Sequence, residues 1–181
     1  MTETELKTIV TKDQYDNINA IFNWDDEKTQ INSYYISPDN ILKKHGITFR
    51  VRTINDEHII QIKKHSGRDG ALQVSEETEF PIELIPDEFS AEEVFNYTGI
   101  KAPVSLIGNL KTVRSSVFFA DGVEVCLDKS EYLGTTDYEI EIEYTSPIPQ
   151  ELLDILYNEG VTFDKPCTGK FSRFMNRLLD A

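Results

Sequence analysis

Charged and uncharged residues alternate along several short segments of this 181-residue chain, and this alternation constrains the fold more than any other feature. Neighbouring side chains of a β-strand point to opposite faces, so Glu3, Glu5 and Lys7 share one face while Thr4 and Leu6 share the other. The same spacing recurs later in the chain, at Arg50 and Arg52 and at Glu139, Glu141 and Glu143. The pattern predicts a mainly β protein in which several strands each present one charged face.

The charges are sorted by segment, because each segment carries mostly one sign. A polar face on a single strand fits ordinary exposure to solvent. An exposed sheet, however, tends to intersperse acids and bases, since like charges on neighbouring strands repel and opposite charges attract. The recurrence of sorted charges therefore favours strands whose charged faces meet inside a barrel.

Eight segments are predicted to be strands, since they are rich in Ile, Val, Thr, Tyr and Phe and lie between turn signals. They span residues 2–10, 30–37, 46–54, 57–64, 71–80, 106–119, 123–128 and 138–144. Hairpin-like turns join several of them, at Asn55-Asp56, at Ser66-Gly67-Arg68-Asp69-Gly70 and at Asp121-Gly122. Antiparallel neighbours are therefore expected.

Helices are expected between and after these strands, at residues 12–22, 38–44, 90–96, 149–159 and 169–180. Thr11 is suited to cap the first of them, and Pro149 opens the fourth. The last places Phe171 and Phe174 at helical spacing, which is typical of a packed face. Since no repeat or long linker interrupts the chain, residues 1–181 are expected to form one α+β domain, mainly β.

The composition, with 39% hydrophobic and 28% charged residues, is typical of a globular protein. No segment approaches the roughly 18 apolar residues of a membrane span, and the N-terminus lacks the pattern of a secretory signal. We therefore expect a cytoplasmic protein with no membrane partner. Its net charge of −14 opposes a general nucleic-acid role, because phosphate backbones are held mainly by Lys and Arg.

The acidic faces offer ligands for a hard divalent cation. Two Glu residues at positions i and i+2 of a strand stand about 6–7 Å apart, so carboxylates from two strands bridge an ion better than one pair alone. If the first and last strands meet, one cluster forms from Glu3, Glu5, Glu139 and Glu141. Such a cluster repels itself unless it holds a cation or protons, and its oxygen ligands suit Mg²⁺ or Mn²⁺.

The basic faces supply a complementary set of donors, namely Arg50, Arg52, Lys63 and Arg114. A charge-assisted hydrogen bond to a phosphate oxygen is worth about 1.5–3 kcal/mol. Four such donors in one barrel indicate a polyphosphate.

At these residues the chain resembles the CYTH superfamily of triphosphate tunnel metalloenzymes, which includes thiamine triphosphatases, inorganic triphosphatases and class IV adenylate cyclases. The resemblance spans nearly the whole chain, and its motifs occur in the family's order. They are Glu3-Thr4-Glu5-Leu6-Lys7, Arg50-Val51-Arg52, Ile60-Gln61-Ile62-Lys63, Glu77-Thr78-Glu79, Leu110-Lys111-Thr112-Val113-Arg114, Leu127-Asp128, Tyr138-Glu139-Ile140-Glu141 and Gly169-Lys170-Phe171-Ser172-Arg173.

The resemblance implies an eight-stranded antiparallel barrel, open at both ends, whose lumen holds the triphosphate. It implies phosphate ligands at Lys7, Arg50, Arg52, Lys63, Arg114 and Lys170. It implies metal ligands, direct or through water, at Glu3, Glu5, Asp128, Glu139 and Glu141. The assignments of Asp128 and Lys170 rest mainly on the resemblance, and the acidic set has further candidates in Glu77, Glu79 and Glu143.

One position departs from the family's YxDTPD-like stretch, since Ile36 stands where an acid would fall. Lys64 and Lys111 lie beside the chosen cations and are expected on the outer, solvated face. Whether Glu76 or Glu77 faces the tunnel stays open, because a strand bulge would exchange their faces.

Together these residues predict metal-dependent attack of water on a terminal phosphorus of an inorganic or small organic triphosphate. Catalysis is assigned to Lys170, at the terminal phosphate or the attacking water, and to Glu5 and Glu141 at the metal. A class IV adenylate cyclase, or a non-catalytic sensor of nucleotides or polyphosphate, would use the same tunnel, so both stay open. The partner is expected to be a small molecule, and the chain a monomer or a homodimer.

Overall fold

The computed structural model describes residues 2–180, apart from the side chain of Arg68. Nine strands and five helices occur within this described range. The strands are β1 (Thr2–Val10), β2 (Asp26–Ile36), β3 (Ile47–Ile54), β4 (Glu57–Asp69), β5 (Leu72–Ile82), β6 (Glu88–Phe89), β7 (Val104–Ala120), β8 (Val123–Tyr132) and β9 (Thr135–Tyr144). The helices are α1 (Lys12–Ile21), α2 (Ile41–Lys44), α3 (Ala91–Thr98), α4 (Gln150–Asn158) and α5 (Lys170–Leu179).

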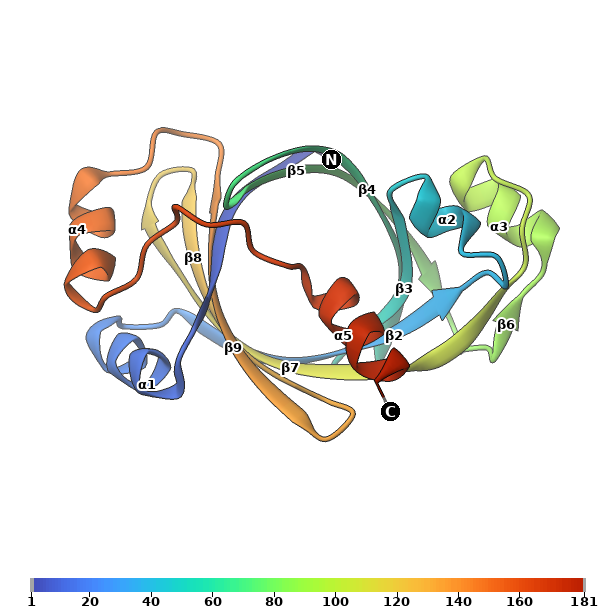
Figure 1. Cartoon of the computed structure of the whole chain (residues 1–181), viewed down its shortest axis with the longest axis horizontal. Helices are drawn as coiled ribbons and strands as arrows, with labels where there is room; N and C mark the ends of the chain where they lie inside the picture. Colours follow the sequence, from blue (N-terminus) through green and yellow to red (C-terminus); the bar gives the residue numbers. More distant parts are fainter. Residues whose placement is uncertain (1, 181) are drawn as a thin grey trace.

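Eight of these strands close into an antiparallel barrel, which confirms the expected fold. The order around the ring is β2-β3-β4-β5-β1-β9-β8-β7, and pairing of β2 with β7 completes it. Figure 1 looks down the barrel, with the helices arranged around and across the ring. Closure leaves no free edge among these eight strands, and the short β6 pairs with one end of β7.

The predicted strands are confirmed, although several are longer than expected. The largest difference is at β4 and β5, which stay paired as far as Asp69 and Leu72. A register shift between His65 and Gly67 allows this continuation. Residues 66–70, predicted as a hairpin loop, are therefore mostly strand, and the turn is confined to Gly70 and Ala71.

Local signals set the helix starts. Thr11 forms a capping box at α1, as expected for an N-cap, and Ser90 does the same at α3. α2 begins at Ile41, later than predicted, because the preceding Asn40 has a left-handed backbone with φ of 56°. In the described part of the chain, none of the helices has the length and apolar character needed to cross a bilayer.

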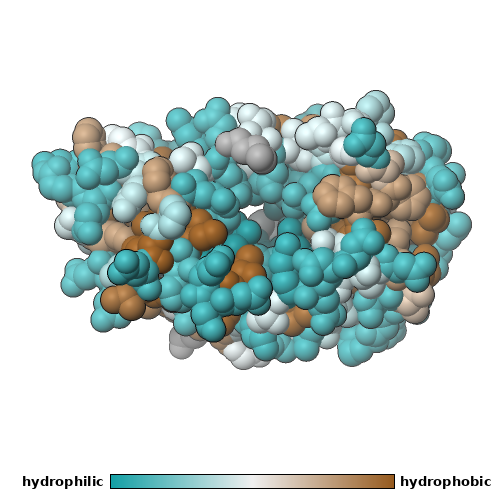
Figure 2. All heavy atoms as spheres, turned by 180° about the vertical axis from the view of Figure 1, so that it is seen from behind, coloured by the Kyte–Doolittle hydropathy of each residue, from teal (hydrophilic) through white to brown (hydrophobic). Residues whose placement is uncertain are grey.

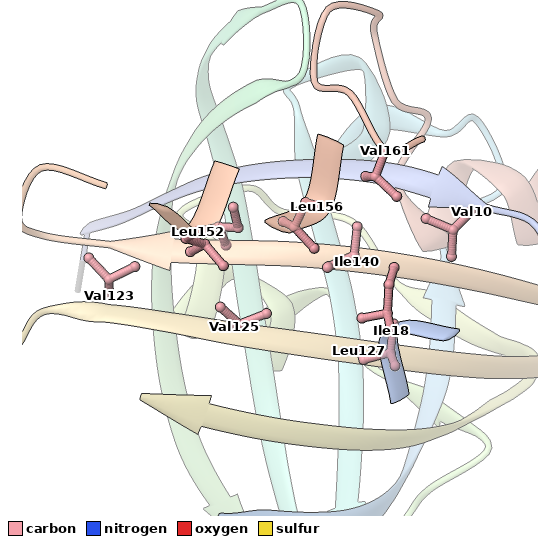
Figure 3. Packing of buried hydrophobic residues seen from close by; sticks show 10 residues of the cluster. Val10, Ile18, Val123, Val125, Leu127, Ile140, Leu152, Leu156 and Val161 are labelled. Carbon is pink, nitrogen blue, oxygen red and sulfur yellow. The ribbon is translucent and has the colours of Figure 1, made fainter. Parts of the chain in front are cut away.

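The hydrophobic core lies outside the barrel, between its wall and the helices. One cluster joins Ile18 of α1 and Leu152 and Leu156 of α4 to Val125 and Ile140 on the outer wall (Figure 3). A second cluster joins α2 and α3 to β3 and β4. Burying one such side chain stabilises the fold by about 1.5–3 kcal/mol. Apolar residues therefore take the outer strand faces, and the charged residues face the lumen.

Helix α5 lies over the rim at one end of the barrel, beside β2 and β7, and the segment that leads into it runs across the ring (Figure 1). Its fully buried Phe174 packs against Tyr34 and Tyr132, with ring centroids 5.3 and 6.0 Å away. Gly108 of β7 makes room for this ring, because a Cβ at position 108 would lie 2.9 Å from Cζ of Phe174. Gly108 also has a backbone φ of 143°, a value that residues other than glycine rarely adopt.

We expect Gly108→Ala to lower the free energy of unfolding by about 1–3 kcal/mol, because overpacking against Phe174 adds to backbone strain. Gly134→Ala is the matched control, since Gly134 also has a positive φ, of 72°, but its Cβ position has no neighbour within 4 Å. Urea unfolding of both variants gives the comparison. Equal losses of stability would contradict a steric requirement at Gly108.

Candidate functional site

The lumen is a cavity of about 850 Å³, lined by the inward strand faces and by the start of α5. On the side opposite α5, the surface is hollowed near its centre and edged mainly by hydrophilic residues (Figure 2). All the predicted site residues except Glu139 line the cavity: Glu3, Glu5, Lys7, Arg50, Arg52, Lys63, Glu77, Glu79, Arg114, Asp128, Glu141, Glu143 and Lys170. Side chains from most of the barrel strands therefore meet in one space.

The structure shows which of Glu76 and Glu77 faces the lumen. β5 turns Glu77 toward the lumen, where it lies 3.2 Å from Nζ of Lys63, and leaves Glu76 exposed. Lys64 and Lys111 are exposed, as expected for the outer faces of β4 and β7.

The acidic residues form two clusters, so the prediction of one cluster containing Glu3, Glu5, Glu139 and Glu141 is wrong. In the antiparallel ladder of β1 and β9, Glu5 faces Glu143, whereas Glu139 faces Ile9. This register carries Glu139 away from Glu3. The first acidic cluster consists of Glu3, Glu5 and Glu143, and the second acidic cluster consists of Asp128, Glu139 and Glu141.

Two lysines partly neutralise the first acidic cluster. Nζ of Lys7 lies 2.6 Å from Oε1 of Glu5. Nζ of Lys63 donates to Glu3 and lies 3.6 Å from Glu5. Because Lys63 also pairs with Glu77, its single charge is shared among three carboxylates.

Glu143 completes the first acidic cluster and shows that the cluster is short of positive charge. Burial raises the pKa of Glu143 to about 7, and the nearby carboxylates of Glu141, Glu3 and Glu5 act in the same direction. The 3.1 Å contact with Nη1 of Arg114 opposes this rise without cancelling it. Each of the three residues offers a carboxylate oxygen within 4.8 Å of the other two, a donor set that suits a hard divalent cation.

Protein cations fill the second acidic cluster. Arg114 donates from Nε and Nη2 to the two oxygens of Asp128, at 2.8 and 2.7 Å. Nζ of Lys170 lies 2.8 Å from both Asp128 and Glu141 and donates to Glu139. Burial alone would raise the pKa of Asp128, but Arg114 and Lys170 hold it below its usual range. Asp128 is therefore ionised and paired.

Arg52 is a half-buried cation without a matching carboxylate in the described range. Its Nε donates to Oδ1 of Asn32 at 3.1 Å, and it makes no ion pair with any residue in the described range 2–180. Burial, together with the nearby charges of Arg50 and Arg114, lowers the pKa of Arg52 to about 9. An anion bound beside Arg52 would oppose this shift.

Sequence reasoning missed Arg173, which contacts the second acidic cluster from α5, and the polar stripe of Gln30, Asn32 and Tyr34 along β2. Arg173 follows Lys170 by three residues, a spacing that places both on one helix face, and this was the available signal. The residues of β2 also alternate, but uncharged side chains do not distinguish a lumen from an exposed face.

Comparison with known proteins agrees with this geometry. A family model of the CYTH domain matches residues 1–159. A candidate triphosphatase of Bacillus subtilis (strain 168), YjbK, is 25% identical over 146 residues, which cover 78% of this chain and 76% of YjbK. The structure of a candidate adenylate cyclase from Bacillus halodurans is 26% identical, with a TM-score of 0.70 and coverage of 95% of this chain and 96% of that one.

A further solved structure, the candidate adenylyl cyclase HpAC1 from Hippeastrum, is described as having a dominant triphosphatase activity. It has a TM-score of 0.78 at 19% identity and covers 96% of this chain and 95% of its own. At this identity the likeness shows a shared fold.

We expect Glu143→Gln to flatten the pH dependence of stability in metal-free protein. A carboxyl group whose pKa is raised on folding holds extra protons in the folded state, so stability falls as pH rises from the unfolded pKa near 4.5 to about 7. Between about pH 5 and about pH 8, wild type should lose on the order of 2 kcal/mol more than Glu143→Gln.

Urea unfolding in the presence of a chelator measures this difference in slope. Glu76→Gln, on the exposed face of β5, is the control and should keep the wild-type slope. A Glu143→Gln slope equal to that of wild type would contradict the assigned charge shortage.

Proposed function

The chain belongs to the CYTH family, and from this membership we propose that it hydrolyses an inorganic or small organic triphosphate in its barrel lumen, with Mg²⁺ or Mn²⁺. One observation carries the proposal: buried cations and a carboxylate cluster short of positive charge face the same enclosed space. Phosphoryl transfer needs little covalent participation by the protein, so positioning and charge neutralisation supply most of the catalysis. No Ser, Cys or His nucleophile is required.

The phosphate chain is assigned to the basic residues of the lumen. Arg50 and Arg52 of β3 and Lys63 of β4 lie on adjacent strands and would donate to phosphate oxygens. Arg50 is held for this by the 2.8 Å bond from its Nε to Oε1 of Gln61. The positive charge of Arg52 is the least balanced of the three, because no carboxylate pairs with it in the described range.

Lys7, Arg114 and Lys170 already pair with carboxylates, so each would bring a phosphate oxygen and an acidic group together. Lys170 is assigned to the terminal phosphate or to positioning the attacking water. Glu141 supports it, since the carboxylate of Glu141 lies 2.8 Å from Nζ of Lys170.

The first acidic cluster is the proposed metal site, with Glu3, Glu5 and Glu143 as ligands. Its oxygen donors and its shortage of positive charge both fit Mg²⁺ or Mn²⁺. When bound, the ion would polarise a phosphate oxygen and neutralise the charge that develops there. Glu143 was only a further candidate in the sequence. It is now the proposed metal ligand beside Glu3 and Glu5, in the role that the sequence had assigned to Glu139.

Class IV adenylate cyclase activity is the second candidate, favoured by the 26% identity to the Bacillus halodurans protein. It would require attack of a ribose 3′-hydroxyl on the α-phosphorus, with pyrophosphate as the leaving group. The two activities therefore differ in their products.

Incubation of the purified chain with Mg²⁺ or Mn²⁺ and inorganic triphosphate, thiamine triphosphate or ATP tests the proposal. Phosphate, pyrophosphate and cyclic AMP are measured separately. We expect phosphate release that a chelator abolishes. Cyclic AMP with pyrophosphate would establish the cyclase instead, and tight triphosphate binding without turnover would establish a sensor.

We expect Lys63→Met to lower kcat/KM by about 10- to 100-fold, because it removes a charge-assisted hydrogen bond worth about 1.5–3 kcal/mol. Lys64→Met is the matched control, since Lys64 neighbours Lys63 on β4 but is exposed on the outer face. Steady-state kinetics of both variants give the comparison. Similar losses in the two would remove Lys63 from the phosphate site.

A further inference from the structure

Helix α5 presents two cations on the face that meets the barrel. Lys170 is its first residue and Arg173 follows one turn later. The side chains of both reach β8 or β9, and each is 12% exposed. Helix α5 is therefore held on the rim of the barrel (Figure 1) by ion pairs as well as by Phe174.

Arg173 joins two acids of β9 to the segment that leads into α5. Its Nε donates to Oδ2 of Asp137 at 2.8 Å, and its Nη1 donates to Oε2 of Glu139 at 2.7 Å. Nη1 also donates to the carbonyl of Thr168. The hydroxyl of Tyr132 donates to Asp137, which fixes that carboxylate in turn. The guanidinium is thereby held in one orientation.

Glu139 accepts hydrogen bonds from both Arg173 and Lys170 and so links the two side chains. One carboxylate oxygen of Glu139 accepts from Arg173, and the other accepts from Lys170. The residue is 1% exposed and does not line the lumen. Since both of its oxygens are occupied by protein donors, Glu139 serves to orient Lys170.

The two acidic clusters differ in how their charge is balanced. The three carboxylates of the second acidic cluster contact four cations, namely Lys7, Arg114, Lys170 and Arg173, and within residues 2–180 Lys170 pairs only with members of this cluster. The first acidic cluster contacts Lys7, Lys63 and Arg114, but each of these cations also pairs with a carboxylate outside that cluster. A divalent cation entering the second acidic cluster would have to displace buried, hydrogen-bonded ammonium and guanidinium groups.

We propose that Arg173 is a positioning residue that fixes Lys170 through Glu139, so that the second acidic cluster is neutralised by protein cations and the lumen takes one metal ion. The catalytic part of this inference rests on the proposed triphosphatase function. The part that concerns metal stoichiometry does not.

Removing Arg173 takes one of two cationic partners from the buried Glu139 and the one cationic partner of the partly buried Asp137 within the described residues. The negative charge of Glu139 then draws more strongly on Lys170, which is the remaining cation in contact with it among residues 2–180. Lys170 loses its fixed position relative to Asp128 and Glu141, and with it the alignment proposed for the terminal phosphate.

Counting bound Mn²⁺ tests the stoichiometry, with electron paramagnetic resonance used to measure the free ion during titration. We expect Lys170→Met to bind one more Mn²⁺ per chain than wild type, because it vacates the space among Asp128, Glu139 and Glu141. Arg177→Met is the matched control, because Arg177 lies one turn beyond Arg173, is exposed, and donates to the carbonyl of Leu133. Equal Mn²⁺ counts in wild type and Lys170→Met would overturn the inference.

A double-mutant cycle tests the positioning role. We expect Arg173→Met to lower kcat at least about 10-fold, with Arg173→Lys retaining part of the activity and Arg177→Met near wild type. In a Lys170→Met background, Arg173→Met should cause little further loss, because its effect passes through Lys170. Independent, multiplicative losses would show that Arg173 acts only on the fold and would overturn the inference.

Urea unfolding verifies that each variant is folded, and Glu139→Gln serves in place of Arg173→Met should the latter not fold. The two proposals fail in different ways. Absence of any triphosphate turnover by wild type would reject the proposed function, whereas the Mn²⁺ counts would still decide the present inference.

Discussion

The balance of buried charge in the lumen is the constraint on which the rest of the structure depends. Asp128, Glu139 and Glu141 are at most 4% exposed, and an isolated ionised group at such depth would be strongly destabilising. Ion pairs limit that cost, but they rarely yield a large net gain. The stability of the fold must therefore come from elsewhere, and it comes from the two apolar clusters outside the barrel together with the cluster around Phe174 of α5. The helices are needed because the inside of the barrel cannot serve as a hydrophobic core.

Strand β1 contributes residues to both the proposed metal site and the proposed phosphate site of the lumen. It lies between β5 and β9 in the ring, so Glu3 and Glu5 at its start lie close to Glu143. Lys7, two residues further on, faces Glu141 of the second acidic cluster. Because β1 changes sign along its inward face, one strand can contribute to the proposed metal site and to the proposed phosphate site. The distance between the two sites then follows from the rise of the strand.

The sequence was sufficient for features that depend on neighbours along the chain. Alternation around Glu5 and Arg52 gave the strands and their inward faces, and the motif order gave the barrel. The sequence did not predict features that depend on the register between paired strands. Whether Glu139 or Glu143 faces Glu5 depends on the register between β1 and β9, two strands that no turn connects, and no local pattern determines that register. Arg173 was missed for the same reason, since its partners Asp137 and Glu139 are more than 30 residues away and belong to a different element.

Helix α5 connects the closure of the barrel with the charge balance inside it. Its apolar side depends on Phe174 and on the space left by Gly108, and its cationic side supplies Lys170 and Arg173 to the second acidic cluster. If α5 moved away, the second acidic cluster would lose Lys170 and Arg173, two of the four cations that contact it, while remaining in a closed barrel. The electrostatic cost of leaving these carboxylates without Lys170 and Arg173 opposes displacement of α5 from its end of the barrel.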